Sequence, residues 1–382
     1  MNNPFVFGKI VRGDLFLNRV KEVSEITETL AAGQNVICYS PRRYGKTSLM
    51  MLVGEKLKED GYIVFFIDFF RVTSLEDLYN IYTTSIAETI QSPVKTLLTT
   101  LQAILPTINP KVVFKSPESP TVEVSIPLPV LSKSQTLHEL FNSLEQYCVK
   151  KKKKGVVIFD EFQEITSIKD GPVIEREMRS AFQHHKNVSY TFLGSKHNLL
   201  RGIFRDKNRP FYNFGRHFEL DVIDDSYWYD FIGKKMGKKC SQNIITEILF
   251  ITECHPYFTQ MLCHFLWFHA RNKSDKLDVS DIQIVLKDIL ERDELFMSDL
   301  WERVTVTERH LLKALAIDRP SNIYDKTFII QHSLGSASSI QKAMNKLIKL
   351  DYIKKTVSGS YSFINPLFRQ WILLNAVQMR SK

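Results

Sequence analysis

A glycine, a lysine and two hydroxyl residues follow one another in the stretch SPRRYGKTS, residues 40–48, which lies between two apolar runs. This spacing fits the pattern G-x-x-x-x-G-K-[ST], in which backbone N–H groups and a helix N-terminus wrap phosphate groups. Gly45, Lys46 and Thr47 match the pattern, but Ser40 stands where the first glycine is expected. Serine fits a tight turn, although it gives up easy access to positive φ. The stretch predicts a phosphate-binding loop, with an ordinary strand-to-helix turn as the alternative.

The polar residues of this loop have predicted roles toward a nucleotide. We expect Lys46 to contact the β- and γ-phosphates of ATP and the Thr47 hydroxyl to hold Mg²⁺. Arginine side chains add positive charge beside the loop. The remaining residues that we predict to bind the nucleotide here are Ser40, Arg42, Arg43, Gly45 and Ser48.

Two acidic residues end a second apolar run, GVVIFDE, at residues 155–161. Such a run predicts a strand buried on both faces, and acids at its carboxyl end lie where α/β sheets bind ligands. We expect Asp160 to hold Mg²⁺ through water and Glu161 to act as the general base on the attacking water. The alternative is the acidic start of a helix. The phosphate loop earlier in the chain favours the nucleotide reading.

Predicted strands alternate with predicted helices around both motifs. Strands are expected at 35–39, 62–68, 156–159 and 188–195, and helices from 48 onward and at 74–104, 136–149 and 173–185. This alternation predicts an α/β fold, a three-layer P-loop NTPase sheet of parallel strands with helices on both faces. The last strand ends in Ser195, which either senses the γ-phosphate and positions water or simply opens a loop. The Pro- and Ser-rich segment 106–134 predicts a β-hairpin insertion on the surface.

Composition and cysteine usage indicate the class of protein. A chain of 382 residues is long enough for two or three domains with sizeable cores. Its 5 cysteines are odd in number and form no CxxC pair, which argues for reduced thiols and against a disulfide framework or a zinc site. The sequence has neither a signal-peptide pattern nor an apolar run of membrane-spanning length. These features predict a cytoplasmic protein without membrane contact.

The positive charge is concentrated near the C-terminal end. The segment 301–382 holds 13 Lys plus Arg against 5 Asp plus Glu, whereas the first 300 residues hold 38 against 37. Such an asymmetry is expected when one module meets a polyanion such as DNA.

A helix in this basic segment carries an apolar stripe on one face, formed by Ile340, Ala343, Met344, Leu347 and Ile348. Two further helices precede it, and two alternating runs around the turn VSGS follow it, which together predict a winged helix-turn-helix. The alternative use of such a module is contact with another protein. If the partner is double-stranded DNA, the residues on the opposite face would meet it: Ser339, Lys342, Asn345, Lys346 and Lys349.

Six short motifs, in this order, carry a resemblance to a known family: FLNRVKEV, SPRRYGKTSL, VVIFDEFQEI, FLGS, RPFYNFGR and CHPYFTQ. They resemble the archaeal-type ATPases of the STAND branch of AAA+ proteins, relatives of the origin-recognition and NACHT-type ATPases. The resemblance covers most of the chain. It implies an ATPase domain, a helical lid and a winged helix.

The resemblance also implies further site residues. Phe16, Asn18 and Arg19 match a box that borders the adenine. His255 and Pro256 match a motif of the helical lid in which the histidine faces the phosphates. The alternative is that His255 only starts a helix.

Arg216 matches an arginine that acts at the nucleotide, in the same molecule or from a neighbouring one. The alternative for Arg216 is a surface ion pair. The family usually has glycine where Ser40, Asn18 and Cys254 stand, and this predicts slow turnover.

The sequence predicts three domains and a leading function. The expected boundaries are 1–222 for the ATPase domain with its insertion, 223–303 for the lid and 304–382 for the winged helix. The leading function is a slow, Mg²⁺-dependent ATPase that acts as a nucleotide switch and touches DNA. One alternative is a scaffold that self-associates on ATP and docks proteins through the winged helix. The other is a DNA-binding regulator whose nucleotide is not hydrolysed.

Overall fold

The computed structural model describes residues 3–11, 13, 16–17, 19–90, 94–105, 111–114, 122–125, 133–271, 273–320, 322–356 and 359–378. They belong to two compact units. One unit is Arg19–Asp221, and the other joins Met1–Asn18 to Val222–Lys382. The second unit is therefore built from two separate stretches of the chain.

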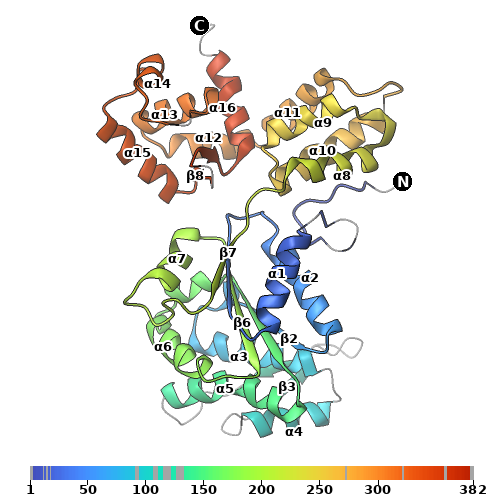
Figure 1. Cartoon of the computed structure of the whole chain (residues 1–382), viewed down its shortest axis with the longest axis vertical. Coiled ribbons are helices and arrows are strands. Elements are labelled where there is room, and N and C mark those ends of the chain that lie inside the picture. Colours follow the sequence, from blue (N-terminus) through green and yellow to red (C-terminus); the bar gives the residue numbers. More distant parts are fainter. Residues whose placement is uncertain are drawn as a thin grey trace. The chain divides into compact units, whose positions relative to one another are not determined.

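The first unit contains a five-stranded sheet in the order β2-β5-β6-β1-β7, in which all neighbouring strands are parallel (Figure 1). Its strands are β1 (Val36–Tyr39), β2 (Ile63–Asp68), β5 (Gly155–Asp160), β6 (Val188–Gly194) and β7 (Arg216–Glu219). The register sets Tyr39 level with Gly194 and Glu219, and Asp68 level with Asp160. The carboxyl ends of the strands therefore meet at one edge, and β6 lies between β1 and β5.

Helices cover both faces of this sheet (Figure 1). They are α1 (Val20–Ala31), α2 (Lys46–Glu59), α3 (Leu75–Ile90), α4 (Val94–Ile104), α5 (Lys133–Lys151), α6 (Gly171–Phe182) and α7 (His197–Arg205), with short 3₁₀ segments η2 (Phe69–Arg71) and η3 (Phe162–Ser167). On one face, Gly54 lets α2 approach the sheet, since a Cβ there would lie 3.3 Å from Val64 Cγ1. On the other face, aromatic rings fill the core, and Phe159 stacks on Phe192 at 5.4 Å.

Two local features refine the sequence prediction for this unit. The helical stretch expected at 74–104 contains two helices, α3 and α4. Within the segment 106–134, β3 (Lys111–Phe114) pairs antiparallel with β4 (Val122–Ser125), and most of the segment's other residues lie outside the described ranges.

The second unit is largely helical. Its first part consists of α8 (Asp225–Met236), η4 (Gly237–Lys239), α9 (Gln242–Thr252), α10 (Pro256–Arg271) and α11 (Val279–Arg292). Its second part consists of α12 (Glu294–Glu302), α13 (Val306–Ile317), α14 (Lys326–Gln331), α15 (Ala337–Lys349), β8 (Ile353–Lys355), β9 (Tyr361–Phe363) and α16 (Pro366–Gln378). Three helices followed by the antiparallel β8–β9 hairpin give the winged-helix arrangement.

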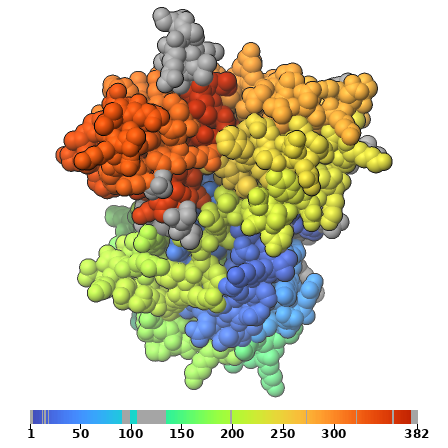
Figure 2. All heavy atoms as spheres, turned by 45° about the horizontal axis from the view of Figure 1, so that its top comes forward, coloured from blue at the N-terminus to red at the C-terminus, as the bar shows by residue number. Residues whose placement is uncertain are grey.

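One continuous hydrophobic core runs through both parts of this unit. Figure 2 shows the α8–α11 part, yellow to light orange, directly against the orange and red winged helix. The N-terminal segment joins the same core, where Phe5 packs edge-on against Phe231 at 6.0 Å. The predicted boundary near residue 303 remains a prediction. Among the described residues, no helix is long and apolar enough to cross a membrane.

Candidate nucleotide site and winged-helix surface

The loop between β1 and α2 has the backbone shape of a phosphate-binding loop. Gly45 has φ 86° and serves as the N-cap of α2, so a residue that tolerates positive φ is needed there. Arg43 is also left-handed, at φ 69°. Ser40 is fully buried and is absent from the positive-φ residues of the described chain, so serine adopts this position without that strain. The glycine that the pattern places there is not required by the backbone.

Lys46 lies inside this loop, with only 6% of its surface exposed. Its Nζ donates to the carbonyl oxygens of Ser40 at 2.8 Å and Pro41 at 3.1 Å. Burial lowers the pKa of the Lys46 ammonium. A buried cation at the N-terminus of a helix is the environment that a phosphate group fits.

Thr47 and Asp160 meet across the carboxyl edge of the sheet. The Thr47 hydroxyl donates to Asp160 Oδ2 at 2.9 Å, although the two residues are far apart in sequence. Burial raises the pKa of the Asp160 carboxyl. A hydroxyl and one carboxylate fit Mg²⁺, which in nucleotide sites takes few protein oxygens and completes its shell with water and phosphate. In the described chain, no cluster of three or more His, Cys, Asp or Glu residues forms a separate metal cage.

Glu161 follows Asp160 in a left-handed conformation, at φ 48°. Its Oε2 accepts a hydrogen bond from the Ser195 hydroxyl at 2.7 Å. Because β6 pairs with both β1 and β5, its tip lies between the phosphate loop and the two acids. Ser195 and Glu161, predicted separately from the sequence, are therefore brought together.

A residue that the sequence analysis did not single out joins this group. The side-chain amide of Gln163 donates to the same Glu161 oxygen, Oε2. Gln163 is fully buried. A glutamine three residues after the end of β5 offers no periodic signal of such a role, and only the side-chain geometry of this turn reveals it.

The other residues predicted in this unit are divided between the two ends of the sheet. Arg19 is buried at the start of α1, and its Nη2 donates to the carbonyl oxygen of Asp221 at 2.5 Å. The residue before Asp221, Leu220, donates its N–H to the carbonyl oxygen of Tyr39, which ends β1. Arg19 therefore lies at the carboxyl edge, near the phosphate loop. Arg42 and Arg43 are exposed on the loop, and Ser48 is buried in the first turn of α2.

Arg216 is not brought to the phosphate loop. The register places it level with Val36, at the amino end of β1, whereas the loop follows the carboxyl end. Its guanidinium instead pairs with Glu25 Oε2 at 3.2 Å and stacks over the Phe218 ring. The geometry therefore does not support a role in its own nucleotide site, and only a role at a neighbouring molecule's site remains a prediction.

The lid residues belong to the second unit, so their contact with a nucleotide remains a prediction. His255 is buried, and its Nδ1 accepts from the Tyr257 N–H at 3.2 Å just where Pro256 begins α10. Cys254 has φ 56°, so the position where the family has glycine does adopt a left-handed backbone. Phe16 also lies in this unit, and Asn18 lies outside the described residues.

The turn before His255 is linked to the winged helix by charge. Glu253 Oε1 accepts from Arg319 Nη2 at 2.8 Å and lies 4.0 Å from Arg369 Nε. Burial raises the pKa of Glu253, while the two arginines oppose that shift. Both guanidinium groups also lie over the Phe250 ring, at 5.5 and 5.9 Å. Residues of α9 and of the winged helix thus form one compact contact.

The α15 helix has the two faces that the sequence predicts. The Ser336 hydroxyl caps it by accepting from Ser339 N–H, and its buried residues are Ile340, Ala343, Met344 and Leu347. Of the predicted nucleic-acid residues, Lys342, Asn345, Lys346 and Lys349 are exposed, whereas Ser339 is half-buried. Lys346 is engaged, however, since its Nζ lies 3.0 Å from Oε1 of the buried Glu308. We therefore expect Lys346 to contribute less to phosphate binding than Lys342 and Lys349 do.

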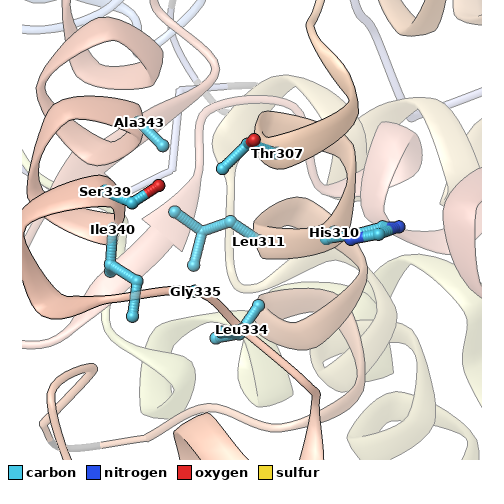
Figure 3. A pocket seen from close by; sticks show the side chains of 8 residues that line it. All are labelled: Thr307, His310, Leu311, Leu334, Gly335, Ser339, Ile340 and Ala343. Atoms are coloured by element: carbon cyan, nitrogen blue, oxygen red, sulfur yellow. The ribbon is translucent and has the colours of Figure 1, made fainter.

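Ser339 also borders a small cavity of about 110 Å³ between α13 and α15 (Figure 3). Leu311, Leu334 and Ile340 give the cavity apolar walls, and the hydroxyls of Thr307 and Ser339 lie on the same side of it. The cavity is too small for a nucleotide.

A family model described as "ATPase domain predominantly from Archaea" matches residues 16–248, and one described as "Probable winged helix domain" matches residues 296–374. A Walker-type ATPase of Pyrococcus abyssi has a similar structure, with a TM-score of 0.64, 18% identity, and coverage of 97% of this chain and 99% of that chain. The Aeropyrum pernix ORC2 protein, solved as ADPNP-ADP complexes, has a TM-score of 0.54, 12% identity, and coverage of 99% and 98%. No curated protein matches the sequence. The predicted fold class is thereby confirmed.

Proposed function

Because the chain belongs to the family of ATPase domains found predominantly in Archaea, we propose that it binds ATP with Mg²⁺ at the phosphate loop and hydrolyses it slowly. One observation carries this proposal. Lys46, the Thr47–Asp160 pair and the Glu161–Ser195 pair lie at the carboxyl ends of three neighbouring strands. Family membership confirms the ATPase class expected from the sequence, and the residue roles are our proposal.

Each residue has a role that its contacts support. Lys46 binds the β- and γ-phosphates, and Thr47 and Asp160 hold Mg²⁺, which neutralises charge on those phosphates. Glu161 accepts a proton from the attacking water. Gln163 and Ser195 both donate to Glu161 Oε2 and hold the carboxylate in place. Slow turnover is proposed because Ser40, Asn18 and Cys254 stand where the family usually has glycine.

We also propose that the nucleotide state is passed to the winged helix. His255 would sense the phosphates, and Glu253, two residues earlier, is held by Arg319 and Arg369. A displacement at this turn changes the contacts that the winged helix makes. Two sites joined by such a contact have the coupling that a nucleotide switch requires.

ATP turnover and ATP affinity test the enzymatic proposal together. Glu161→Gln keeps the shape of the side chain and removes the proton acceptor, so turnover should fall by roughly 10²-fold or more while ATP affinity is kept. Glu177→Gln is the matched control, because Glu177 lies on α6 and bonds Ser134, outside the strand ends. Unchanged turnover in Glu161→Gln would remove Glu161 from the base role. A wild-type chain that binds ATP without hydrolysing it would favour the regulator with a bound, intact nucleotide.

A second function, association with double-stranded DNA, is favoured by the exposed lysine face of α15 and the charge surplus of its segment. Each phosphate contact adds about 0.9 to the slope of log affinity against log salt. Lys342→Ala with Lys349→Ala should flatten the slope by about 2, and Lys346→Ala should flatten it less because Glu308 already pairs with it. A wild-type chain without salt-dependent affinity for any duplex would favour the protein-docking scaffold. Self-association measured with and without ATP tests the scaffold directly.

We propose three further assignments. The start of the winged-helix match at residue 296 supports separate lid and winged-helix domains. The free cysteines support a reducing compartment such as the cytoplasm. Placement in the STAND branch rests on the sequence motifs, and a comparison of the lid motifs across the family would test it. Labelling the chain in cells would test the cytoplasmic location.

A further inference from the structure

Gln163 is a buried amide that directly contacts the proposed general base. It lies in η3, and none of its surface is exposed. Its Nε2 donates to Glu161 Oε2 and, at 3.3 Å, to Glu164 Oε1. Its own Oε1 is buried and has no hydrogen-bond partner within the described residues. An unpaired buried oxygen destabilises a fold, so packing alone does not account for an amide at this place.

The neighbouring strand makes room for this amide. A Cβ added to Gly194, at the end of β6, would lie 2.3 Å from Gln163 Oε1. Any side chain at residue 194 would therefore displace the amide from Glu161. A residue of η3 and the residue that ends β6 thus together permit this contact.

The contact selects one of the two carboxylate oxygens of Glu161. Ser195 and Gln163 approach from different elements, and both donate to Oε2. Oε1 accepts from neither of them. Two donors at Oε2 fix the plane of the Glu161 carboxylate, and this also fixes the direction in which Oε1 points.

We infer that Gln163 is a positioning residue: its amide, together with Ser195, holds Glu161 Oε2 and presents Oε1 to the attacking water. This inference rests on the proposed role of Glu161 as the general base. In the step served, a water O–H bond breaks and its proton passes to Oε1, while the water oxygen bonds the γ-phosphorus and ADP leaves with the electron pair of the broken P–O bond. Gln163 touches neither the water nor the nucleotide.

Gln163→Met tests the inference, because methionine has a similar length and cannot donate a hydrogen bond. In the full-length chain, we expect kcat to fall about tenfold, less than the roughly 10²-fold loss of the base itself, with KM for ATP unchanged. A split of this kind, with kcat lowered and KM for ATP kept, reports misplacement of the base and not loss of ATP binding. A role in stability alone would lower the melting temperature and leave kcat per folded molecule unchanged. Gln183→Met, which changes an exposed glutamine bonded to Arg179, is the matched control.

A second variant keeps the test decisive if Gln163→Met folds poorly. Gly194→Ala leaves Gln163 in the chain and pushes its amide away, so it should also lower kcat while KM for ATP is kept. Circular dichroism confirms folding of each variant. Wild-type kcat in both variants would overturn the positioning role and leave the ATPase proposal standing. Absence of turnover in the wild-type chain would overturn both.

Discussion

The ion pair between Glu253 and the two arginines is expected to hold the lid turn against the winged helix. The exposed fractions of the side chains are 13% for Glu253, 5% for Arg369 and 43% for Arg319. Glu253→Gln keeps the size of the side chain but leaves the buried Arg369 without a counter-charge. Removing one partner of a buried pair destabilises by about 3–5 kcal/mol. Because Arg319 is open to solvent, we expect the lower end, about 3 kcal/mol.

Tryptophan fluorescence can follow this unit alone. All 4 tryptophans, at 228, 267, 301 and 371, lie in Val222–Lys382. In a unit of this size, 1 kcal/mol shifts the melting temperature by about 2–4 °C, so Glu253→Gln should lower Tm by roughly 6–12 °C. Arg319→Gln is the matched control and should lower Tm by no more than about 2–4 °C, since exposed pairs contribute at most about 1 kcal/mol.

Melting temperatures test the ion pair, and their response to ATP tests the switch. Equal Tm values for Glu253→Gln and Arg319→Gln would mean that the buried Arg369 does not depend on Glu253. A further measurement concerns the switch: the change in Tm on adding ATP should shrink in Glu253→Gln if the turn carries the nucleotide signal. An ATP-dependent change that is fully kept in this variant would separate the ion pair from the switch.

Three further predictions concern the loop, the metal and the lid. Lys46→Ala should weaken ATP binding by about 10- to 100-fold, the scale of lost charge-assisted hydrogen bonds, and calorimetry that finds equal affinity would refute the loop assignment. Burial raises the pKa of Asp160, so its carboxyl needs a higher pH to ionise than a free aspartate does, and the Mg²⁺-dependent part of ATP affinity should be lost as pH falls. Calorimetry with and without Mg²⁺ should place the midpoint of this loss above the pKa of a free aspartate, and a midpoint at or below that pKa contradicts the prediction. Cys254→Gly should change the unfolding free energy by less than about 1 kcal/mol, because relief of the left-handed backbone offsets the entropy of glycine, whereas Cys254→Val should destabilise by about 1–2 kcal/mol in the same melts.

The sequence was sufficient for features that local patterns determine. The apolar runs before the phosphate loop and before Asp160 predicted buried parallel strands, and the structure contains them. The stripe beginning at Ile340 predicted a helix with one buried face, which α15 has. These features depend on residues within a few positions of each other, so spacing alone reveals them.

Features that depend on distant pairing could not be predicted. Arg216 followed a motif in the right order, but the register of β7 against β1 sets which end of the sheet it occupies. The sequence presents Lys346 as an unpaired cation, but in the structure it pairs with Glu308 of α13. The contacts of Glu253 with Arg319 and Arg369 likewise join residues whose pairing is fixed by packing and not by spacing.

The N-terminal segment of the second unit has a consequence for how the chain is made. Phe5 packs on Phe231, and its carbonyl lies 2.7 Å from Nδ1 of His264. A ribosome adds about 5–20 residues per second, so Phe5 waits roughly 13–50 seconds before its partners have been synthesised. During that time the intervening sheet unit can fold while an apolar N-terminal segment stays uncovered. A chaperone that binds short apolar segments could bind this N-terminal segment during that time. The segment is covered only after α10 has left the ribosome and supplies His264.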